Sequence, residues 1–251
     1  MSKSKLKIAF YWAASCGGCE IAVLDLNEKI LDVLNLADIV FWPVALDVKY
    51  KDVEDLPDKH IDITFFNGSV RNSEQEHMAK LLRKKSKTLV AFGSCAHEGC
   101  IPGLANLNSK QEIFEQVYLK DTSNINPNSV TPKTETVVKE GTLKLPEFYD
   151  TVKTLDQTVE VDYYLPGCPP PVELIAAAVD AIAKNSLPPK GSVLAPPKAV
   201  CDECERKRDN KKISKLYRVY EKDPDPEICL LDQGILCIGP ATRSGCGARC
   251  L

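Results

Sequence analysis

Cys16 and Cys19 are separated by two glycines in "SCGGC", where an apolar run gives way to a helical pattern. A C-x-x-C between a strand and a helix acts as a dithiol redox switch in some proteins, because the helix N-terminus lowers the pKa of the thiols. The same spacing gives two thiolates to iron or zinc. The motif alone leaves both chemistries open, so the other cysteines have to distinguish them.

The chain has eleven cysteines among its 251 residues and begins "MSKSKLKIAF", without the apolar stretch or cleavage site of a secretory signal. We therefore expect a cytoplasmic protein, in which thiols stay reduced and disulfides are rare. Cysteines at this density favour metal or cluster binding over disulfides and over buried free thiols.

The charge balance argues against nucleic acid and membranes as partners. Lys and Arg number 32 and Asp and Glu 35, which gives a net charge of -3 and no strong field of either sign. No segment approaches the roughly 18 consecutive apolar residues of a membrane span. The basic run at 205–215 is interpreted as a solvated face, because no aromatic residues are interleaved with it.

Short apolar runs rich in β-branched residues predict strands covered on both faces. They lie at 6–13, 38–45, 61–68 and 88–94. Helical patterns at 19–36 and 73–86 separate them, and Ser73 with a Glu three residues later predicts a capped helix start. This alternation predicts an α/β domain with a parallel sheet.

The pattern loosens from about 104 to 157, which we interpret as an insertion over the sheet. A last strand is expected at 159–166 and a last helix at 172–185.

A Pro-rich linker follows at 186–199, and six of the eleven cysteines come after it. We therefore expect two domains, 1–190 and 191–251, the second small and loop-rich.

Four cysteines follow predicted strands, and the carboxyl ends of parallel strands meet at one rim of a sheet. They are Cys16, Cys19, Cys95 and Cys168. Four thiolates at one place are what a 4Fe-4S cluster takes, so the opening motif is interpreted as one corner of a cluster site. Glycines beside these cysteines would let the backbone approach the cluster: Gly17, Gly18, Gly93 and Gly167. Zinc is the competing metal, but its four-cysteine sites usually pair two C-x-x-C corners.

Two further residues of the Cys95 loop, His97 and Cys100, are interpreted as bystanders, with Cys100 as a weaker fifth candidate. The C-terminal domain offers four cysteines for a second 4Fe-4S cluster: Cys201, Cys204, Cys229 and Cys237. Cys246 and Cys250 remain as half of a third set.

Three motifs together resemble those of NiFe-hydrogenase small subunits: "ASCGGCE", "AFGSCAHEGCIPGLAN" and "YYLPGCPPPVELI". The cysteine pattern of the tail is similar to that of the cytoplasmic group that includes methyl-viologen-reducing hydrogenases. The resemblance covers nearly the whole chain.

The resemblance implies a flavodoxin-like first domain whose proximal 4Fe-4S cluster, held by the four rim cysteines, faces the NiFe site of a separate large subunit. It implies that Cys201, Cys204, Cys229 and Cys237 hold the distal 4Fe-4S cluster. Cys246 and Cys250 match the first part of the medial motif, and relatives carry a further pair of cysteines beyond the position of Leu251, so a third cluster is expected to draw on ligands outside this sequence.

The first functional hypothesis is therefore an electron-transfer subunit of an oxygen-sensitive, cytoplasmic, hetero-oligomeric NiFe hydrogenase, an oxidoreductase. It would pass electrons between the NiFe site of the large subunit and a flavin- or iron-sulfur-containing acceptor subunit. A quinone-reductase subunit of the complex I type is an alternative, although the six-cysteine tail argues against it. A zinc-stabilised scaffold without redox function is a second alternative. Glu20, beside Cys19, is interpreted as an ordinary helix N-terminal acid or as a group on a proton path.

Overall fold

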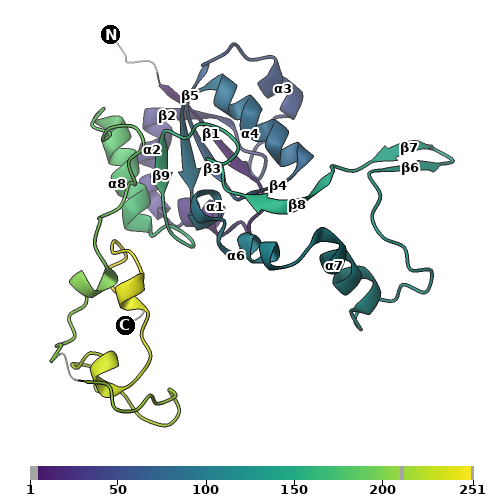
Figure 1. Ribbon diagram of the computed structural model, residues 1–251. Coiled ribbons are helices and arrows are strands. Elements are labelled where there is room, and N and C mark those ends of the chain that lie inside the picture. The colour runs from purple at the N-terminus through teal and green to yellow at the C-terminus, as the bar shows by residue number, and fades with distance from the viewer. Residues whose placement is uncertain (1–4, 210–211, 250–251) are drawn as a thin grey trace. The chain divides into compact units, whose positions relative to one another are not determined.

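The computed structural model describes residues 5–209 and 212–249 (Figure 1). By its internal contacts the chain divides into two compact units, Met1–Leu194 and Ala195–Leu251. The sequence places this boundary after residue 190. The difference arises because the amide of Leu194 donates a hydrogen bond to the carbonyl of Tyr164 (2.7 Å), which ties the first part of the expected linker to the first unit.

The first unit is built on a five-stranded sheet whose neighbouring strands are all parallel. Its strands are β1 (Leu6–Trp12), β2 (Ala37–Phe41), β3 (Ile61–Asn67), β5 (Ser86–Phe92) and β9 (Tyr163–Leu165). They lie in the order β2-β1-β3-β5-β9. Counting only the strands of this sheet along the chain, the order is 2-1-3-4-5, that of flavodoxin-like folds. The predicted parallel α/β architecture is confirmed.

Helices cover both faces of the sheet, so alternate residues of a strand enter two different cores (Figure 1). The helices are α1 (Gly18–Leu24), η1 (Asn27–Lys29), α2 (Ile30–Leu36), α3 (Tyr50–Glu54), α4 (Ser73–Lys85) and α8 (Val172–Ala183). On β1, Ile8 and Phe10 pack with α1, α2 and α8, whereas Ala9 and Tyr11 pack with α3 and α4. Burial on both faces explains why the strands are continuous apolar runs.

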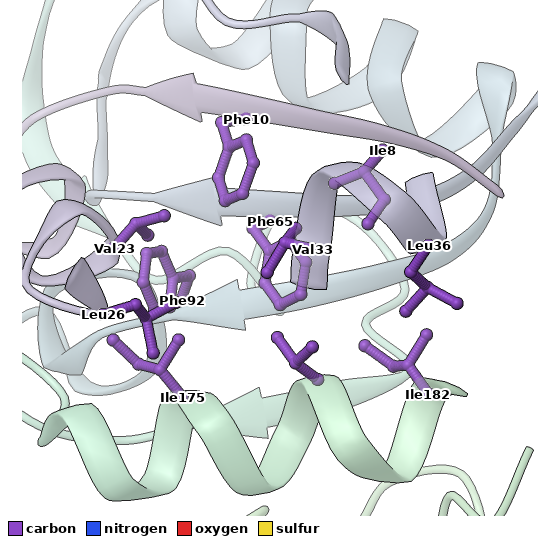
Figure 2. Close-up of a pocket in the computed structure, with 11 residues that line it drawn as sticks. Ile8, Phe10, Val23, Leu26, Val33, Leu36, Phe65, Phe92, Ile175 and Ile182 are labelled. Atoms are coloured by element: carbon purple, nitrogen blue, oxygen red, sulfur yellow. The ribbon is translucent and has the colours of Figure 1, made fainter. Parts of the chain in front are cut away.

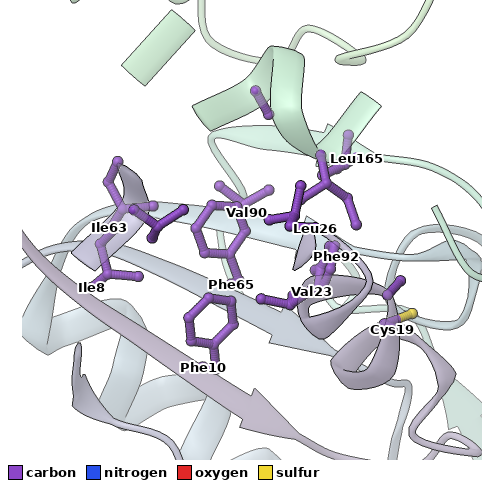
Figure 3. Packing of buried hydrophobic residues seen from close by; sticks show 14 of the residues in the cluster. Ile8, Phe10, Cys19, Val23, Leu26, Ile63, Phe65, Val90, Phe92 and Leu165 are labelled. Carbon is purple, nitrogen blue, oxygen red and sulfur yellow. The ribbon is translucent and has the colours of Figure 1, made fainter. Parts of the chain in front are cut away.

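Aromatic rings form the centre of the core on the α8 face (Figure 3). Phe65 stacks on Phe10 with ring centroids 5.3 Å apart, and it meets Phe92 edge to face at 5.7 Å. A narrow cavity of about 20 Å³ remains between these rings and the helices, with Ile175 and Ile182 of α8 on its far side (Figure 2). All of its lining residues are apolar, so the cavity offers nothing to orient a polar ligand.

Three local predictions are wrong, and in two of them a side chain or a backbone torsion intervenes. The helix expected over 19–36 is broken, and Asn27 at the break has a left-handed backbone (φ 51°). The cap of α4 is Asn72 rather than Ser73, because the Ser73 hydroxyl accepts a hydrogen bond from the amide of Glu147. The strand expected over 159–166 is paired only at Tyr163–Leu165.

The insertion after β5 differs from the expected cover over the sheet. Its elements are α5 (Ser94–Glu98), α6 (Cys100–Gly103), η2 (Leu104–Leu107), α7 (Lys110–Phe114), the π-helix η3 (Glu115–Lys120), β6 (Glu135–Val138), β7 (Gly141–Lys144) and β8 (Phe148–Lys153). Strand β8 pairs antiparallel with the short β4 (Val70–Asn72), and β6 and β7 form a hairpin. The hairpin residues are almost all exposed, so this part of the insertion buries little of the sheet (Figure 1).

The second unit is rich in loops, as expected for the small C-terminal domain. Its regular elements among the described residues are the short 3-10 helices η4 (Val200–Asp202), η5 (Leu231–Gln233) and η6 (Gly239–Ala241). Isolated bridges join distant segments, including Ala199 with Arg243 and Lys207 with Ile228. Among the helices that the structure describes, none combines the length and the apolar character needed to cross a membrane.

Candidate metal centres

The loops after β1, β5 and β9 bring Cys16, Cys19, Cys95 and Cys168 to the carboxyl end of the sheet. We call this group, together with Cys100, the rim site. Cys19 and Cys95 are buried, whereas Cys16 and Cys168 are exposed. Each of these four thiols lies within electrostatic range of others in the group.

Backbone hydrogen bonds fasten the three loops to one another. The amide of Ser94 donates to the carbonyl of Gly167 (2.8 Å), which joins the Cys95 loop to the Cys168 loop. Ser69 joins the other pair: it exchanges two backbone hydrogen bonds with Ala14 (2.9 and 3.0 Å), and its hydroxyl donates to the carbonyl of Cys95 (2.6 Å). Sequence reasoning missed Ser69, because a serine outside the motifs gives no signal of a contact across the sheet.

Cys19, Cys95 and Cys168 hold their thiol protons more tightly than ordinary cysteines, because their pKa values are raised. Burial, and then the neighbouring Cys95, Glu20, Cys16 and Cys168, raise the pKa of Cys19 to about 12. Burial, and then Cys100, Cys168 and Cys16, raise the pKa of Cys95 to about 12. Crowded thiols repel one another as thiolates, and a cation bound among them reverses this effect and deprotonates them. The electrostatics therefore fit a site that is completed by a positively charged metal group.

The structure places Cys100 inside this group and not beside it. Its thiol is close enough to those of Cys95 and Cys168 to raise the pKa of both. Its backbone is left-handed (φ 44°), and it directly follows Gly99, which also has a positive φ (82°). This turn between α5 and α6 leaves the Cys100 thiol near those of Cys95 and Cys168, so the rim holds a fifth thiol in addition to the four that were expected. His97 instead lies with its ring against Tyr164, at 4.6 Å between centroids.

Glu20 is a buried carboxylate, 3% exposed, although it stands in the first turn of α1. The indole N–H of Trp42 and the amide N–H of Asn67 (3.3 Å) donate to it. Burial raises its pKa, and these two hydrogen bonds lower it in part. The residue following Cys19 is thereby fixed to the ends of β2 and β3, a contact that the sequence does not reveal.

The four cysteines predicted for the second cluster line one pocket in the second unit. We call it the tail site, and its cysteines are Cys201, Cys204, Cys229 and Cys237. The pocket has a volume of about 20 Å³, and Leu230, Leu231 and Pro240 contribute apolar walls. The amide of Cys229 donates to the carbonyl of Lys207 (2.8 Å), which draws the third cysteine toward the segment of the first two.

Cys246 is held close to the segment of the first two tail cysteines by Glu203. One carboxylate oxygen of Glu203 accepts from the amide of Gly245 (2.7 Å) and the other from the amide of Gly247 (2.9 Å). The amide of Val200 also donates to the carbonyl of Thr242 (3.0 Å). Cys250, the other residue predicted for a third cluster, lies outside the described residues.

The donor set of the tail site fits an iron-sulfur cluster. Four thiols line one pocket there, together with two arginines and apolar side chains, and four cysteine thiolates are what such a cluster takes. Within residues 5–209 and 212–249, no three His, Cys, Asp or Glu side chains meet closely enough to hold one metal ion.

A flavodoxin-like sheet with thiols gathered at its carboxyl rim, followed by a cysteine-lined tail unit, defines an oxidoreductase subunit with metal-binding sites. Residues 16–182 match the family model described as NADH ubiquinone oxidoreductase, 20 Kd subunit. The chain belongs to this family, and within it the chain is a small subunit of a NiFe hydrogenase.

The relatives support this assignment over almost the whole chain. The chain is 47% identical to an iron-sulfur subunit of the F420-non-reducing hydrogenase of Archaeoglobus profundus, over 98% of this chain and 78% of that protein. It is 39% identical to a subunit of the F420-non-reducing hydrogenase of Methanocaldococcus jannaschii, over 98% and 77%. Because the matches include the tail unit, they separate this chain from the complex I alternative.

A solved structure is similar to about three quarters of the chain. It is an NAD+-reducing [NiFe]-hydrogenase in the H2-reduced state, similar with a TM-score of 0.63 and 28% identity, over 73% of this chain and 94% of that one.

Proposed function

We propose that this chain is the electron-transfer subunit of its hydrogenase. In this role it relays electrons between the NiFe site of a large subunit and an acceptor subunit that contains flavin or iron-sulfur clusters. The observation that carries the proposal is the presence of two separate thiol sets, at the rim of the sheet and in the tail pocket. Two such sets suit a relay, because electron transfer over a distance needs more than one stopping point.

In this proposal Cys16, Cys19, Cys95 and Cys168 hold the proximal cluster, and Cys201, Cys204, Cys229 and Cys237 hold the distal one. A 4Fe-4S group bound by four thiolates takes up and releases single electrons. The residues around the thiols have their own tasks. Ser69 fixes the Cys95 loop relative to the first cysteine loop. Leu230, Leu231 and Pro240 limit the access of water to the tail thiols.

The exposed side of the rim site is the proposed contact with the large subunit. Two of its thiols are exposed, and apolar side chains in the adjoining helices are exposed as well: Ile21 (57%) and Leu24 (51%) of α1, and Ile101 (66%) of α6. Apolar residues left in water beside a functional site are typical of a surface that a partner covers.

Cys246 and Cys250 are proposed to contribute to a third, medial cluster. The complex is proposed to work in the cytoplasm.

Metal analysis of the purified complex tests the proposal. Iron and acid-labile sulfide in equal amounts are expected, with EPR signals of more than one reduced cluster. The decisive variants are Cys19→Ala for the rim site and Cys229→Ala for the tail site, each of which should abolish hydrogen-driven reduction of the acceptor. Zinc in place of iron, or full electron transfer by both variants, would show that the chain is a scaffold.

A further inference from the structure

The basic run that the sequence presents as a solvated face reaches the tail site. Arg206 and Arg208 line the same pocket as Cys201, Cys204, Cys229 and Cys237. Lys212 of the same run is exposed and is not among the residues that line the pocket. Arg206 and Arg208 of the run are therefore placed at the thiols, whereas Lys212 is exposed outside the pocket.

The two arginines reach the pocket in different ways. The guanidinium of Arg206 donates to the carbonyls of Asp225 (2.7 Å) and Ile228 (3.1 Å), so this residue also holds the chain just before Cys229. Arg208 lines the pocket from an exposed position. Arg206 combines a structural task with its charge, whereas Arg208 allows the charge to be tested more directly.

The composition of the wall makes this charge effective. Apart from the cysteines, the lining residues that the structure describes are two arginines and the apolar Leu230, Leu231 and Pro240, with no carboxylate among them. An arginine keeps its charge at all ordinary pH values. A charge beside apolar walls is screened less than one in open water, so it acts on a neighbouring charged group more strongly.

We propose that Arg206 and Arg208 raise the reduction potential of the group held by the four tail cysteines. This inference rests on the proposed function, in which those cysteines bind a 4Fe-4S cluster. When such a cluster takes up one electron from its neighbour in the relay, the neighbour is oxidised and the tail cluster gains one negative charge. A fixed guanidinium at the wall stabilises this added charge, and cluster potentials respond to nearby charge and hydrogen bonding. The tail site is thereby set to receive electrons.

The test is an EPR-monitored redox titration of the complete complex, with the tail signal identified as the one missing from Cys237→Ala. We compare Arg208→Gln, which removes the charge, with Arg208→Lys, which keeps it. Lys212→Gln is the matched control, because it removes one charge from the same basic run outside the pocket. Arg208→Gln should shift the reduction equilibrium of the tail signal toward the oxidised form by up to about tenfold, or about 59 mV for one electron. Arg208→Lys should restore most of the shift, and Lys212→Gln should cause little.

The outcomes distinguish a failure of the proposed function from a failure of the proposed role of the two arginines. If the wild-type complex has no iron signal that depends on Cys237, the proposed function is wrong. If that signal exists but Arg208→Gln and Lys212→Gln shift it equally, or not at all, the role of the arginines is refuted. Loss of the tail iron from Arg208→Gln would also refute it, because Arg208 would then be needed for cluster binding and not for its potential.

Discussion

Gly93 leaves the space that the thiol of Cys19 occupies: a Cβ atom at Gly93 would lie 2.3 Å from the Cys19 Sγ. Gly93 also has a left-handed backbone (φ 83°), which side chains disfavour. The two residues come from the loops after β5 and β1, so the fit between them fixes how closely those loops approach.

Gly93→Ala should therefore displace the Cys19 thiol and impair the rim site. We expect the complex to lose most of the iron that belongs to the rim site and most of its hydrogen-driven activity, measured by iron analysis and EPR. Gly103→Ala is the matched control, because a Cβ atom there meets nothing within 4 Å. Full iron in Gly93→Ala would mean that the close approach of the two loops is not required for the site.

The choice of ligands at the rim can be tested with paired cysteine variants. Cys168→Ala removes one of the four proposed ligands and should abolish the proximal EPR signal. Cys100→Ala removes the fifth thiol, which contacts Cys95 and Cys168 but is not among those ligands, so the signal should persist. If Cys100→Ala destroyed the signal and Cys168→Ala did not, the ligand assignment would be wrong.

The fold was accessible from the sequence because its strands are buried on both faces. The run ending at Trp12 is continuously apolar after Lys7, and runs of this kind separated by helical patterns predict a parallel sheet. The four tail cysteines that the sequence assigns to one cluster line one pocket, and their assignment as its ligands stays a prediction.

Features that depend on contacts between distant segments were not accessible. The positions of Ser69 and Cys100 at the rim follow from turns and from hydrogen bonds between loops. The burial of Glu20 depends on Trp42 and Asn67, which are 22 and 47 residues away in the sequence. A serine, a glutamate or a basic run has the same appearance in the sequence whether or not such a partner exists.

Asp162 should control the acid stability of the first unit. Its carboxylate, 1% exposed, accepts hydrogen bonds from Arg83 (2.6 Å) and from the amide of Leu89 (2.8 Å), and it pairs with Lys190 (2.5 Å). Burial alone would raise its pKa, but these partners outweigh burial and lower it. Because the folded-state pKa lies below the unfolded one, the stabilisation is present above the unfolded pKa and is lost as the pH falls through the folded pKa.

Asp162→Asn should lower the free energy of unfolding by about 3 kcal/mol near neutral pH, because it leaves the largely buried Arg83 without its counter-charge. The loss should shrink as the pH falls below the ordinary range of an aspartate. Denaturant unfolding at several pH values measures both effects. The control is Asp180→Asn, which breaks an exposed pair with Lys184 (3.6 Å) and should cost about 0.5 kcal/mol or less. An equal cost for the two variants would show that Asp162 is not a structural anchor.

Glu203 should determine the order of the segment around Cys246. Its two carboxylate oxygens accept from the amides of Gly245 (2.7 Å) and Gly247 (2.9 Å), one on each side of that cysteine. Charge-assisted hydrogen bonds of this kind contribute about 1.5 to 3 kcal/mol each. Removing the carboxylate frees both amides together, so the loop that carries Cys246 loses its attachment to the segment between Cys201 and Cys204.

Hydrogen exchange of the segment 242–248 in the complete complex measures this directly, because amide protection reports local opening. Glu203→Ala should speed exchange in this segment by at least about tenfold, the factor that corresponds to about 1.4 kcal/mol. Glu203→Gln keeps one acceptor oxygen but turns an NH2 group toward the second amide, so it should show an intermediate effect. Glu205→Gln, two residues along the same chain, is the matched control and should leave exchange unchanged. Unaltered protection in Glu203→Ala would mean that other contacts hold Cys246 in place and that the carboxylate is dispensable.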